Sequence, residues 1–330
     1  MKAAVYYRTG PPDVLLYEEV PDPVPGPGQV AVRVQAISIE GGDVLNRAGG
    51  AMPATPHIVG YQAAGVVARL GEGVEGFRPG DRVVAFMWSG SHASVAVAAA
   101  RHVYRVPEGF DIVKAAVVPV AYGTAHDCLF EYGRLKSGET VLIQGGASGV
   151  GVAAIQLAKR AGARVLATAS GDDRAARLTG FGADLAINYQ TTDVVAAVKA
   201  ATDGRGADLI VDPIAGPALV QSLGSIAYRG RITLVGTASR DRSTPELWPL
   251  MRQCASLIGV FLGGDLDRQP ERTRTMIERL IDECASGKLP PVIDRIFPLS
   301  EAAAAHAYVE SRRAVGRVVL VPDDERAAVS

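Results

Sequence analysis

The stretch Thr140-Val-Leu-Ile-Gln-Gly-Gly-Ala-Ser-Gly-Val-Gly-Val-Ala-Ala-Ile-Gln-Leu-Ala-Lys159 decides the fold. Its opening residues 141–143 are all apolar, as in a buried parallel strand. A turn of small residues follows at 145–151, and the apolar residues after it recur at helical spacing. This order predicts a dinucleotide-binding element, because glycines let the backbone approach a pyrophosphate and the helix N-terminus stabilises its charge.

The fingerprint G-x-G-x-x-G falls at residues 146–151, with Ser148 in place of the second glycine. A glycine-rich turn alone is weak evidence, because such turns also serve as plain connections. A second strand, expected at 164–169, follows the helix at the distance that a βαβ unit requires. We therefore predict that the cofactor contacts this turn, at Gly146, Ala147, Ser148, Gly149, Val150 and Gly151.

Length and composition indicate a globular protein of about two domains. The chain has 330 residues, of which 48% are hydrophobic and 21% charged, and its net charge is -1. No basic surplus favours nucleic acid or an anionic membrane, and the apolar runs are too short to cross a bilayer. The three cysteines lie far apart, which argues against a disulfide framework. With no signal peptide expected at the N-terminus, the prediction is a cytoplasmic protein.

The pattern of the chain changes three times. Residues 1–120 are β-rich, with a helical pattern only from about 115 onward. Residues 121–262 alternate strands and helices, the signature of a doubly wound parallel sheet. Its strands are expected at 140–145, 164–169, 185–187, 208–212, 231–235 and 256–261. Residues 263–322 are expected to return to the first domain and complete it, and residues 323–330 to form a flexible tail.

Six spaced motifs occur in an order that is more specific than any one of them. They are Gly-Gln-Val-Ala-Val-Arg-Val (28–34), Ala-Gly-Val-Val (64–67), Phe-Arg-Pro-Gly-Asp-Arg-Val (77–83), Gly-Ala-Ser-Gly-Val-Gly (146–151), Gly-Ala-Asp-Leu-Ala-Ile-Asn-Tyr (182–189) and Gly-Arg-Ile-Thr-Leu-Val-Gly (230–236). On these motifs the chain resembles the medium-chain dehydrogenase/reductase superfamily, specifically its zinc-independent quinone oxidoreductase branch of the zeta-crystallin type. The resemblance implies a Rossmann domain inserted in a GroES-like barrel domain, NADPH as the cofactor, and a homodimer.

The two segments in which zinc-dependent members of the superfamily bind the metal depart from that pattern. The Cys-x-x-Asp segment reads Glu40-Gly-Gly-Asp43, and the Gly-His-Glu segment reads Gly60-Tyr61-Gln62. Zinc sites need thiolate and imidazole ligands, which these segments lack. The five histidines are scattered and favour surface or packing roles. The prediction is therefore a protein without a bound metal.

The residues after the second strand indicate which dinucleotide binds. An acidic residue at the end of this strand would bind the ribose of NAD and repel the 2′-phosphate of NADP. Ser170 occupies this place, and Arg174 follows within one helical turn, where it can pair with a phosphate. These residues favour NADP(H) over the alternative, in which Ser170 or Asp172 only caps the next helix and Arg174 is solvated. Asp172 and Asp173 argue mildly against NADP(H). Two further residues match family positions near the 2′-phosphate, Tyr189 and Arg312.

The reacting centre is less clearly marked. The hydride chemistry would belong to the nicotinamide, which the protein orients in a dry pocket. Thr124 matches the family threonine beside the nicotinamide, or is a helix residue satisfied by its own backbone. Glu40 is the candidate proton donor and Tyr61 the second, although the Glu40 carboxylate can equally be held by local backbone N–H groups. Further expected contacts are Gly236, Phe261 and Leu262 at the ends of strands, with Asn46 and Gln62 as polar residues of the substrate pocket.

The leading functional prediction is an NADPH-dependent reductase of a quinone or an activated carbon–carbon double bond. Quinone reductases of this branch usually have Asn and Tyr where this chain has Glu40 and Leu45, so both substrate classes stay open. The alternative is an NADPH-binding structural or regulatory protein with little catalysis, and zinc-free alcohol oxidation is less favoured. The apolar segment 256–262 is expected at a sheet edge, where pairing with its symmetry mate would form the homodimer.

Overall fold

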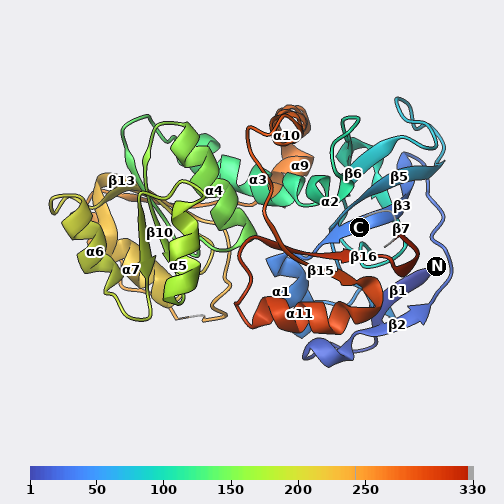
Figure 1. Ribbon diagram of the computed structural model, residues 1–330, viewed down its shortest axis with the longest axis horizontal. Coiled ribbons are helices and arrows are strands. Elements are labelled where there is room, and N and C mark those ends of the chain that lie inside the picture. The colour runs from blue at the N-terminus through green and yellow to red at the C-terminus, as the bar shows by residue number, and fades with distance from the viewer. Residues whose placement is uncertain (242, 326–330) are drawn as a thin grey trace. The chain divides into compact units, whose positions relative to one another are not determined.

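The computed structural model describes residues 1–241 and 243–325, which form two compact units. Unit 1 contains Met1–Val120 and the chain from Asp265 onward, and unit 2 contains Ala121–Gly264. Figure 1 shows unit 2 mainly in green and yellow, and unit 1 in blue and red because both ends of the chain contribute to it. This arrangement confirms the prediction that a Rossmann domain is inserted in a GroES-like domain.

Unit 2 is built on a six-stranded, wholly parallel sheet, as the alternating pattern predicts. The strand order is β11-β10-β9-β12-β13-β14, and every residue of the central strand β9 is buried. Strands buried on both faces need continuous apolar sequence, which explains why they are visible in the sequence. The strands are β9 (Thr140–Ile143), β10 (Arg164–Ala169), β11 (Leu185–Asn188), β12 (Ala207–Asp212), β13 (Ile226–Leu234) and β14 (Ser256–Gly259).

Helices connect these strands and bury apolar residues, except for the last and shortest of them, which has no buried residue. They are α4 (Gly149–Arg160), α5 (Asp172–Thr179), α6 (Val194–Ala201), α7 (Pro217–Ser225) and the short α8 (Trp248–Arg252), and α3 (Val118–His126) with a π-helical turn (Asp127–Glu131) precedes the sheet. One apolar cluster joins β9, β10 and β12 to α6 and α7. Since each helix follows a strand, the carboxyl ends of the strands and the helix N-termini meet at one edge, where such folds bind nucleotides.

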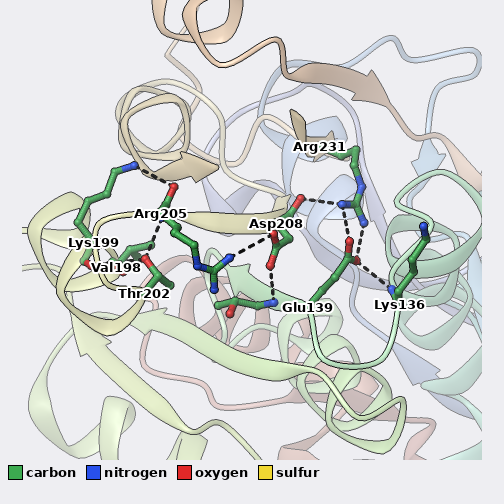
Figure 2. A network of polar contacts seen from close by, with 10 residues as sticks. Lys136, Glu139, Val198, Lys199, Thr202, Arg205, Asp208 and Arg231 are labelled. Atoms are coloured by element: carbon green, nitrogen blue, oxygen red, sulfur yellow. Dashed lines mark hydrogen bonds and ion pairs between the residues drawn. The ribbon is translucent and has the colours of Figure 1, made fainter. Parts of the chain in front are cut away.

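The opposite edge of the sheet is held by charged contacts, which Figure 2 shows. Arg231 of β13 donates to both carboxylate oxygens of Glu139, at 2.9 and 2.7 Å, and to the Asp208 carbonyl at 3.0 Å. The Asp208 carboxylate accepts from the Thr140 N–H, where β9 begins. These contacts join the starts of β9 and β12 to Arg231 within β13, away from the carboxyl ends of the strands, so we assign them to the stability of the sheet and not to cofactor binding.

Unit 1 contains a seven-stranded sheet and a three-stranded sheet. The larger one follows the order β15-β16-β3-β5-β6-β8, with β7 also paired to β3, and the smaller one the order β2-β1-β4. The bounds are β1 (Lys2–Tyr6), β2 (Leu16–Glu19), β3 (Gln29–Ser38), β4 (His57–Ile58), β5 (Gln62–Leu70), β6 (Arg82–Phe86), β7 (Val95–Ala99), β8 (Val103–Arg105), β15 (Ile293–Pro298) and β16 (Arg317–Val321). Strand β16 pairs with β3, so the C-terminal segment contributes a strand to the larger sheet of unit 1.

The helices of unit 1 include one that the sequence interpretation missed. They are α1 (Gly41–Gly49), α2 (Ile112–Ala115), α9 (Leu262–Arg268, which begins in unit 2), α10 (Pro270–Ala285) and α11 (Ala302–Glu310). The expectation that residues before about 115 contain no helix is wrong, because α1 lies at 41–49. Its glycines hide the helical pattern, but Glu40 and Asp43 form a reciprocal capping box that starts the helix.

Two further boundaries differ from the sequence interpretation. Strand β14 ends at Gly259, so Phe261 lies beyond the strand and Leu262 is the first residue of α9. The tail expected at 323–330 begins with a 3-10 turn over Asp323–Glu325, and Glu325 accepts hydrogen bonds from Arg33 and Gln35. These bonds hold the first residues of the tail, and residues 326–330 lie outside the described part of the chain.

Candidate cofactor and substrate sites

The glycine turn after β9 has the shape that a dinucleotide needs. Gly145 has a φ of +60°, and its N–H donates to the Thr168 hydroxyl at 3.0 Å. The Gly146 N–H donates to the Thr168 carbonyl at 2.7 Å, which holds the turn against β10. A Cβ at Gly151 would lie 2.3 Å from the Gly145 carbonyl oxygen, so no side chain fits there. The turn thus packs closely against the start of α4, as the glycine turn of a dinucleotide-binding element does.

Ser148 explains how the turn tolerates a departure from the glycine fingerprint. It is the N-cap residue of α4, and its Oγ accepts a hydrogen bond from the Gly151 N–H at 3.0 Å. A serine is among the best N-cap residues, because its oxygen satisfies a backbone donor that the helix leaves unpaired. The positive end of the α4 dipole still points out of the turn, where it favours a phosphate.

A second layer of polar side chains supports the turn, and the sequence interpretation missed it. The Thr168 hydroxyl donates to Gln144 Oε1 at 2.8 Å, and Gln144 Nε2 contacts the Ser222 hydroxyl at 3.4 Å. Ser222 donates to Asp212 Oδ2 at 3.0 Å, and Asp212 Oδ1 accepts from the Ala215 N–H at 2.9 Å. All these side chains are buried. Gln144, Thr168 and Asp212 each have a signal in the sequence, a polar residue at or beside the carboxyl end of an apolar strand, whereas Ser222 lies within α7 and has no such signal.

The predicted 2′-phosphate residues of unit 2 come together at the ends of β10 and β11. Arg174 Nη1 donates to Ser170 Oγ, which joins the first turn of α5 to the residue after β10. The Tyr189 N–H donates to the Ala169 carbonyl at 3.1 Å, so Tyr189 follows β11 beside the same strand end. Arg312 belongs to unit 1, where it is exposed after α11 with a φ of +55°. Its place near the phosphate therefore stays a prediction.

The other predicted cofactor contacts of unit 2 lie on different elements. Gly236 follows β13, and a Cβ there would lie 2.7 Å from the Pro213 carbonyl oxygen, so this position requires glycine. Thr124 is a buried residue of α3. Phe261 is 66% exposed, whereas Leu262 is buried. The contacts of these residues with a cofactor stay predictions.

In unit 1, Glu40 lies in a buried ionic cluster. Its side chain forms an ion pair with Arg317 of β16 and accepts a hydrogen bond from the Ser38 hydroxyl at 2.7 Å. Only 1% of Glu40 is exposed. Burial raises the pKa of the Glu40 carboxyl, and the Arg317 guanidinium and the Ser38 hydroxyl offset part of that rise. The cluster thus contains a carboxyl that is engaged by two partners.

Asp43 and Tyr61 lie beside the same ionic cluster of Glu40 and Arg317. Asp43 Oδ2 accepts a hydrogen bond from the Glu40 N–H at 2.9 Å, and burial raises the Asp43 pKa well above its usual value. The Tyr61 hydroxyl lies over Gly42, where an added Cβ would be 2.8 Å from it. Burial, with the carboxyls of Asp43 and Glu40 nearby, raises the Tyr61 pKa well above its usual value. Tyr61 therefore keeps its proton at neutral pH and can donate a hydrogen bond.

The two residues predicted as polar pocket residues differ in their surroundings. Gln62 is fully buried, and its Oε1 accepts from the Val120 N–H at 2.7 Å while its Nε2 donates to the Ala116 carbonyl. These bonds connect β5 to the α2–α3 segment, which gives Gln62 a structural role. Asn46 is exposed on α1. A contact of either residue with substrate stays a prediction.

Neither a metal-binding cluster nor a membrane-spanning helix is found among the described residues. Residues 1–241 and 243–325 contain no group of three or more His, Cys, Asp and Glu side chains placed to hold a metal ion. None of the helices in these residues combines the length and apolar character needed to cross a membrane.

Comparison with known proteins gives matches over nearly the whole chain. Residues 26–108 match the family described as alcohol dehydrogenase GroES-like domain, and residues 149–282 the family described as zinc-binding dehydrogenase. The chain is 31% identical to quinone oxidoreductase from Sus scrofa over 326 residues, covering 97% of this chain and 98% of that protein. It is 32% identical to 2-haloacrylate reductase from Burkholderia sp. over 331 residues, with the same coverage. The solved structure of Escherichia coli quinone oxidoreductase complexed with NADPH has a TM-score of 0.92 and 27% identity, covering 98% of this chain and 100% of that one.

Proposed function

We propose that this protein is an NADPH-dependent reductase that acts without zinc on quinones or activated carbon–carbon double bonds. The chain belongs to the quinone oxidoreductase family of medium-chain dehydrogenases/reductases. The pairing of Arg174 with Ser170 directly after β10 carries the cofactor half of this proposal. The bound NADPH of the Escherichia coli relative supports it. The names of the relatives from Sus scrofa and Burkholderia sp. support the two substrate classes.

When bound, NADPH supplies a hydride to an electrophilic carbon of the substrate. Quinones and conjugated carbonyl compounds accept a hydride without a metal, because the developing charge moves onto their own oxygen. The chain must then supply a hydrogen-bond donor to that oxygen and a path for the proton. The protonated hydroxyl of Tyr61 is the donor that we favour in unit 1.

Glu40 stays the predicted proton donor, but its contacts support an alternative role in which it positions Tyr61. Its ion pair with Arg317 and its bond from Ser38 are those of a carboxylate that is held in place. A carboxyl in this state orients the start of α1, which carries Asp43 and the Gly42 backbone beside Tyr61. We propose that Glu40 acts mainly through this positioning of Tyr61. We also propose that zinc has no part, because Glu40 and Tyr61 replace ligands in the two segments with which zinc-dependent members bind the metal.

Arg174→Ala is expected to lower the preference for NADPH over NADH by about 10–100-fold, because a charge-assisted hydrogen bond contributes about 1.5–3 kcal/mol. The measurement is kcat/KM for each cofactor at a fixed substrate concentration. Arg164→Ala is the matched control, since Arg164 begins β10 at the other end of the strand and is exposed. An unchanged preference in Arg174→Ala, or an equal drop in Arg164→Ala, would contradict the phosphate assignment.

We assign the homodimer interface to the β14 edge of the parallel sheet. Strand β14 pairs only with β13 among the described strands, and apolar side chains are exposed on it and around it. They are Leu257 (37% exposed), Trp248 (59%), Met251 (61%) and Phe261 (66%). A free edge with such side chains is usually covered, and a symmetry mate covers it by continuing the sheet.

Sedimentation tests this interface, with a dimer expected for the unmodified chain. Leu257→Arg is expected to sediment as a monomer, because a charge would be buried at the edge. Val24→Arg is the matched control, since Val24 is 78% exposed in unit 1 and lies away from β14 in the sequence. A monomeric unmodified chain, or a Leu257→Arg variant that remains a dimer, would rule out this edge.

A further inference from the structure

Two acidic residues follow Ser170 in the segment that we assign to the 2′-phosphate. Asp172 and Asp173 open α5, only two and three residues after Ser170. A carboxylate near a phosphate is repelled by it, so these side chains ought to weaken NADPH binding. The contacts of the buried Asn188 indicate how the chain avoids this for Asp172.

Asn188 is the last residue of β11, and its side chain bonds to Gly171 before α5, to Asp172 at the start of α5 and to Gln190 after β11. Its Oδ1 accepts hydrogen bonds from the Gly171 N–H at 3.0 Å and the Gln190 N–H at 3.1 Å. Its Nδ2 donates to Asp172 Oδ1 at 2.8 Å. The two backbone donors define which end of the amide is oxygen, because the NH₂ group cannot accept from them. The nitrogen must therefore face the Asp172 carboxylate.

The helical positions of Asp172 and Arg174 separate their side chains. Asp172 lines a groove together with Ala175, Ala176 and Thr179 of α5, opposite Leu185 and Ala186 of β11. Arg174 is two positions after Asp172, which is about 200° around an α-helix. Arg174 points instead to Ser170. The Asn188 bond therefore holds the Asp172 carboxylate on the β11 side of α5, and the arginine lies on the other side.

We propose that Asn188 is a specificity-determining positioning residue, which keeps the Asp172 carboxylate away from the 2′-phosphate of NADPH. The inference rests on the proposed function, since it takes Ser170 and Arg174 as the phosphate site. Asn188 itself does not contact the phosphate in this account. It acts through Asp172, and also through the Gly171 N–H, which determines where Ser170 lies.

Removal of the Asn188 amide tests the proposal through cofactor preference. In Asn188→Ala the Asp172 carboxylate is free to turn toward the phosphate, which is expected to raise the Kd and KM for NADPH about tenfold at low salt. NADH has no 2′-phosphate, so its Kd and KM are expected to change less than about twofold. The loss for NADPH is expected to shrink at high salt, because the repulsion is electrostatic. Fluorescence titration and steady-state kinetics with both cofactors measure these values.

A second substitution separates positioning from a general structural role. Asn188→Ala combined with Asp172→Asn removes the released charge and is expected to recover most of the lost NADPH affinity. Asp173→Asn in the Asn188→Ala background is the matched control, because it removes the same charge from the next residue, whereas the Asn188 amide bonds to Gly171, Asp172 and Gln190. An equal loss for both cofactors in Asn188→Ala, or no recovery in the Asp172 double variant, would overturn the proposal.

Asp172→Asn alone tests the proposal even if Asn188→Ala does not fold. With Asn188 present, this change is expected to alter the NADPH preference less than about twofold, because the carboxylate already lies away from the phosphate. A rise of about tenfold would show that Asp172 faces the phosphate and would overturn the inference. If Arg174→Ala keeps its NADPH preference, the phosphate site is overturned as well. If Arg174→Ala loses that preference but Asn188→Ala weakens NADPH and NADH binding equally, only the role of Asn188 is overturned.

Discussion

Arg317→Leu is expected to lower the free energy of unfolding by about 3–5 kcal/mol at neutral pH, because removal of one partner of a buried ion pair leaves an uncompensated charge. Arg317 forms an ion pair with Glu40, and both side chains are less than one-tenth exposed. Arg317 also donates to the Ile39 carbonyl at 3.3 Å, directly before Glu40. Without the guanidinium, the Glu40 carboxyl must take up a proton or bring water into the core, and both cost stability.

Urea unfolding followed by circular dichroism measures this loss. Arg313→Leu is the matched control from the same C-terminal segment, because Arg313 is exposed and lies over the Tyr308 ring at 5.3 Å. Its expected loss is below about 1 kcal/mol. The double variant Glu40→Gln with Arg317→Leu is expected to recover part of the stability, since no charge is then buried. A loss below about 1 kcal/mol in Arg317→Leu would contradict the buried ion pair.

The second large effect is expected from pH, through two buried histidines. His92 Nε2 lies 3.0 Å from His306 Nε2, and neither residue has measurable exposure. Burial lowers the His92 pKa to about 3. Burial, with the neighbouring His92 ring and the Arg47 charge, lowers the His306 pKa well below its usual value. Both rings are therefore neutral in the folded chain at pH values where they are protonated in the unfolded chain.

The sign of the pH effect follows from these pKa directions. Below about pH 6.5 the unfolded chain binds two protons that the folded chain does not, so stability falls as the pH falls, by about 1.4 kcal/mol per pH unit for each histidine. The expected loss between pH 7 and pH 5 is about 4 kcal/mol. Burial raises the pKa values of Glu40 and Asp43, which favours proton binding in the folded chain as the pH falls and acts in the opposite direction.

Urea unfolding at a series of pH values tests the histidine pair. The slope of the free energy of unfolding against pH between 5 and 6.5 is expected to be steep for the unmodified chain. In the double variant His92→Leu with His306→Leu, the slope is expected to lose the contribution of about two protons, about 1.4 kcal/mol per pH unit for each. The comparison cancels the contributions of Glu40 and Asp43, which are present in both proteins. Equal slopes in the two proteins would show that these histidines take up protons in the folded state.

The sequence predicts the parallel sheet well, because its central strands are buried on both faces. The β9 segment and its neighbours are runs of apolar residues, which neither an exposed strand nor a loop needs. The glycine turn is equally visible, since the close approach of Gly151 to the Gly145 carbonyl excludes any side chain. Ser148 departs from the fingerprint and still fits, because capping α4 uses its hydroxyl.

The buried polar groups of unit 1 are beyond the reach of the sequence interpretation. Glu40 and Arg317 are 277 positions apart, and His92 and His306 are 214 positions apart, as their numbers show. No local pattern links such residues, because the pairing of β16 with β3 brings the first pair together and tertiary packing the second. The capping box of α1 was readable as a short-range signal, but its glycines favour a turn.

Steady-state oxidation of NADPH and NADH, followed by absorbance, tests the central claim most directly. The substrates are 1,4-benzoquinone, 9,10-phenanthrenequinone, 2-alkenals and a 2-enoyl thioester, each with and without a chelator. We predict turnover with NADPH that exceeds turnover with NADH and does not change with the chelator. NADPH binding without turnover of any of these substrates, or turnover that the chelator abolishes, would contradict this prediction.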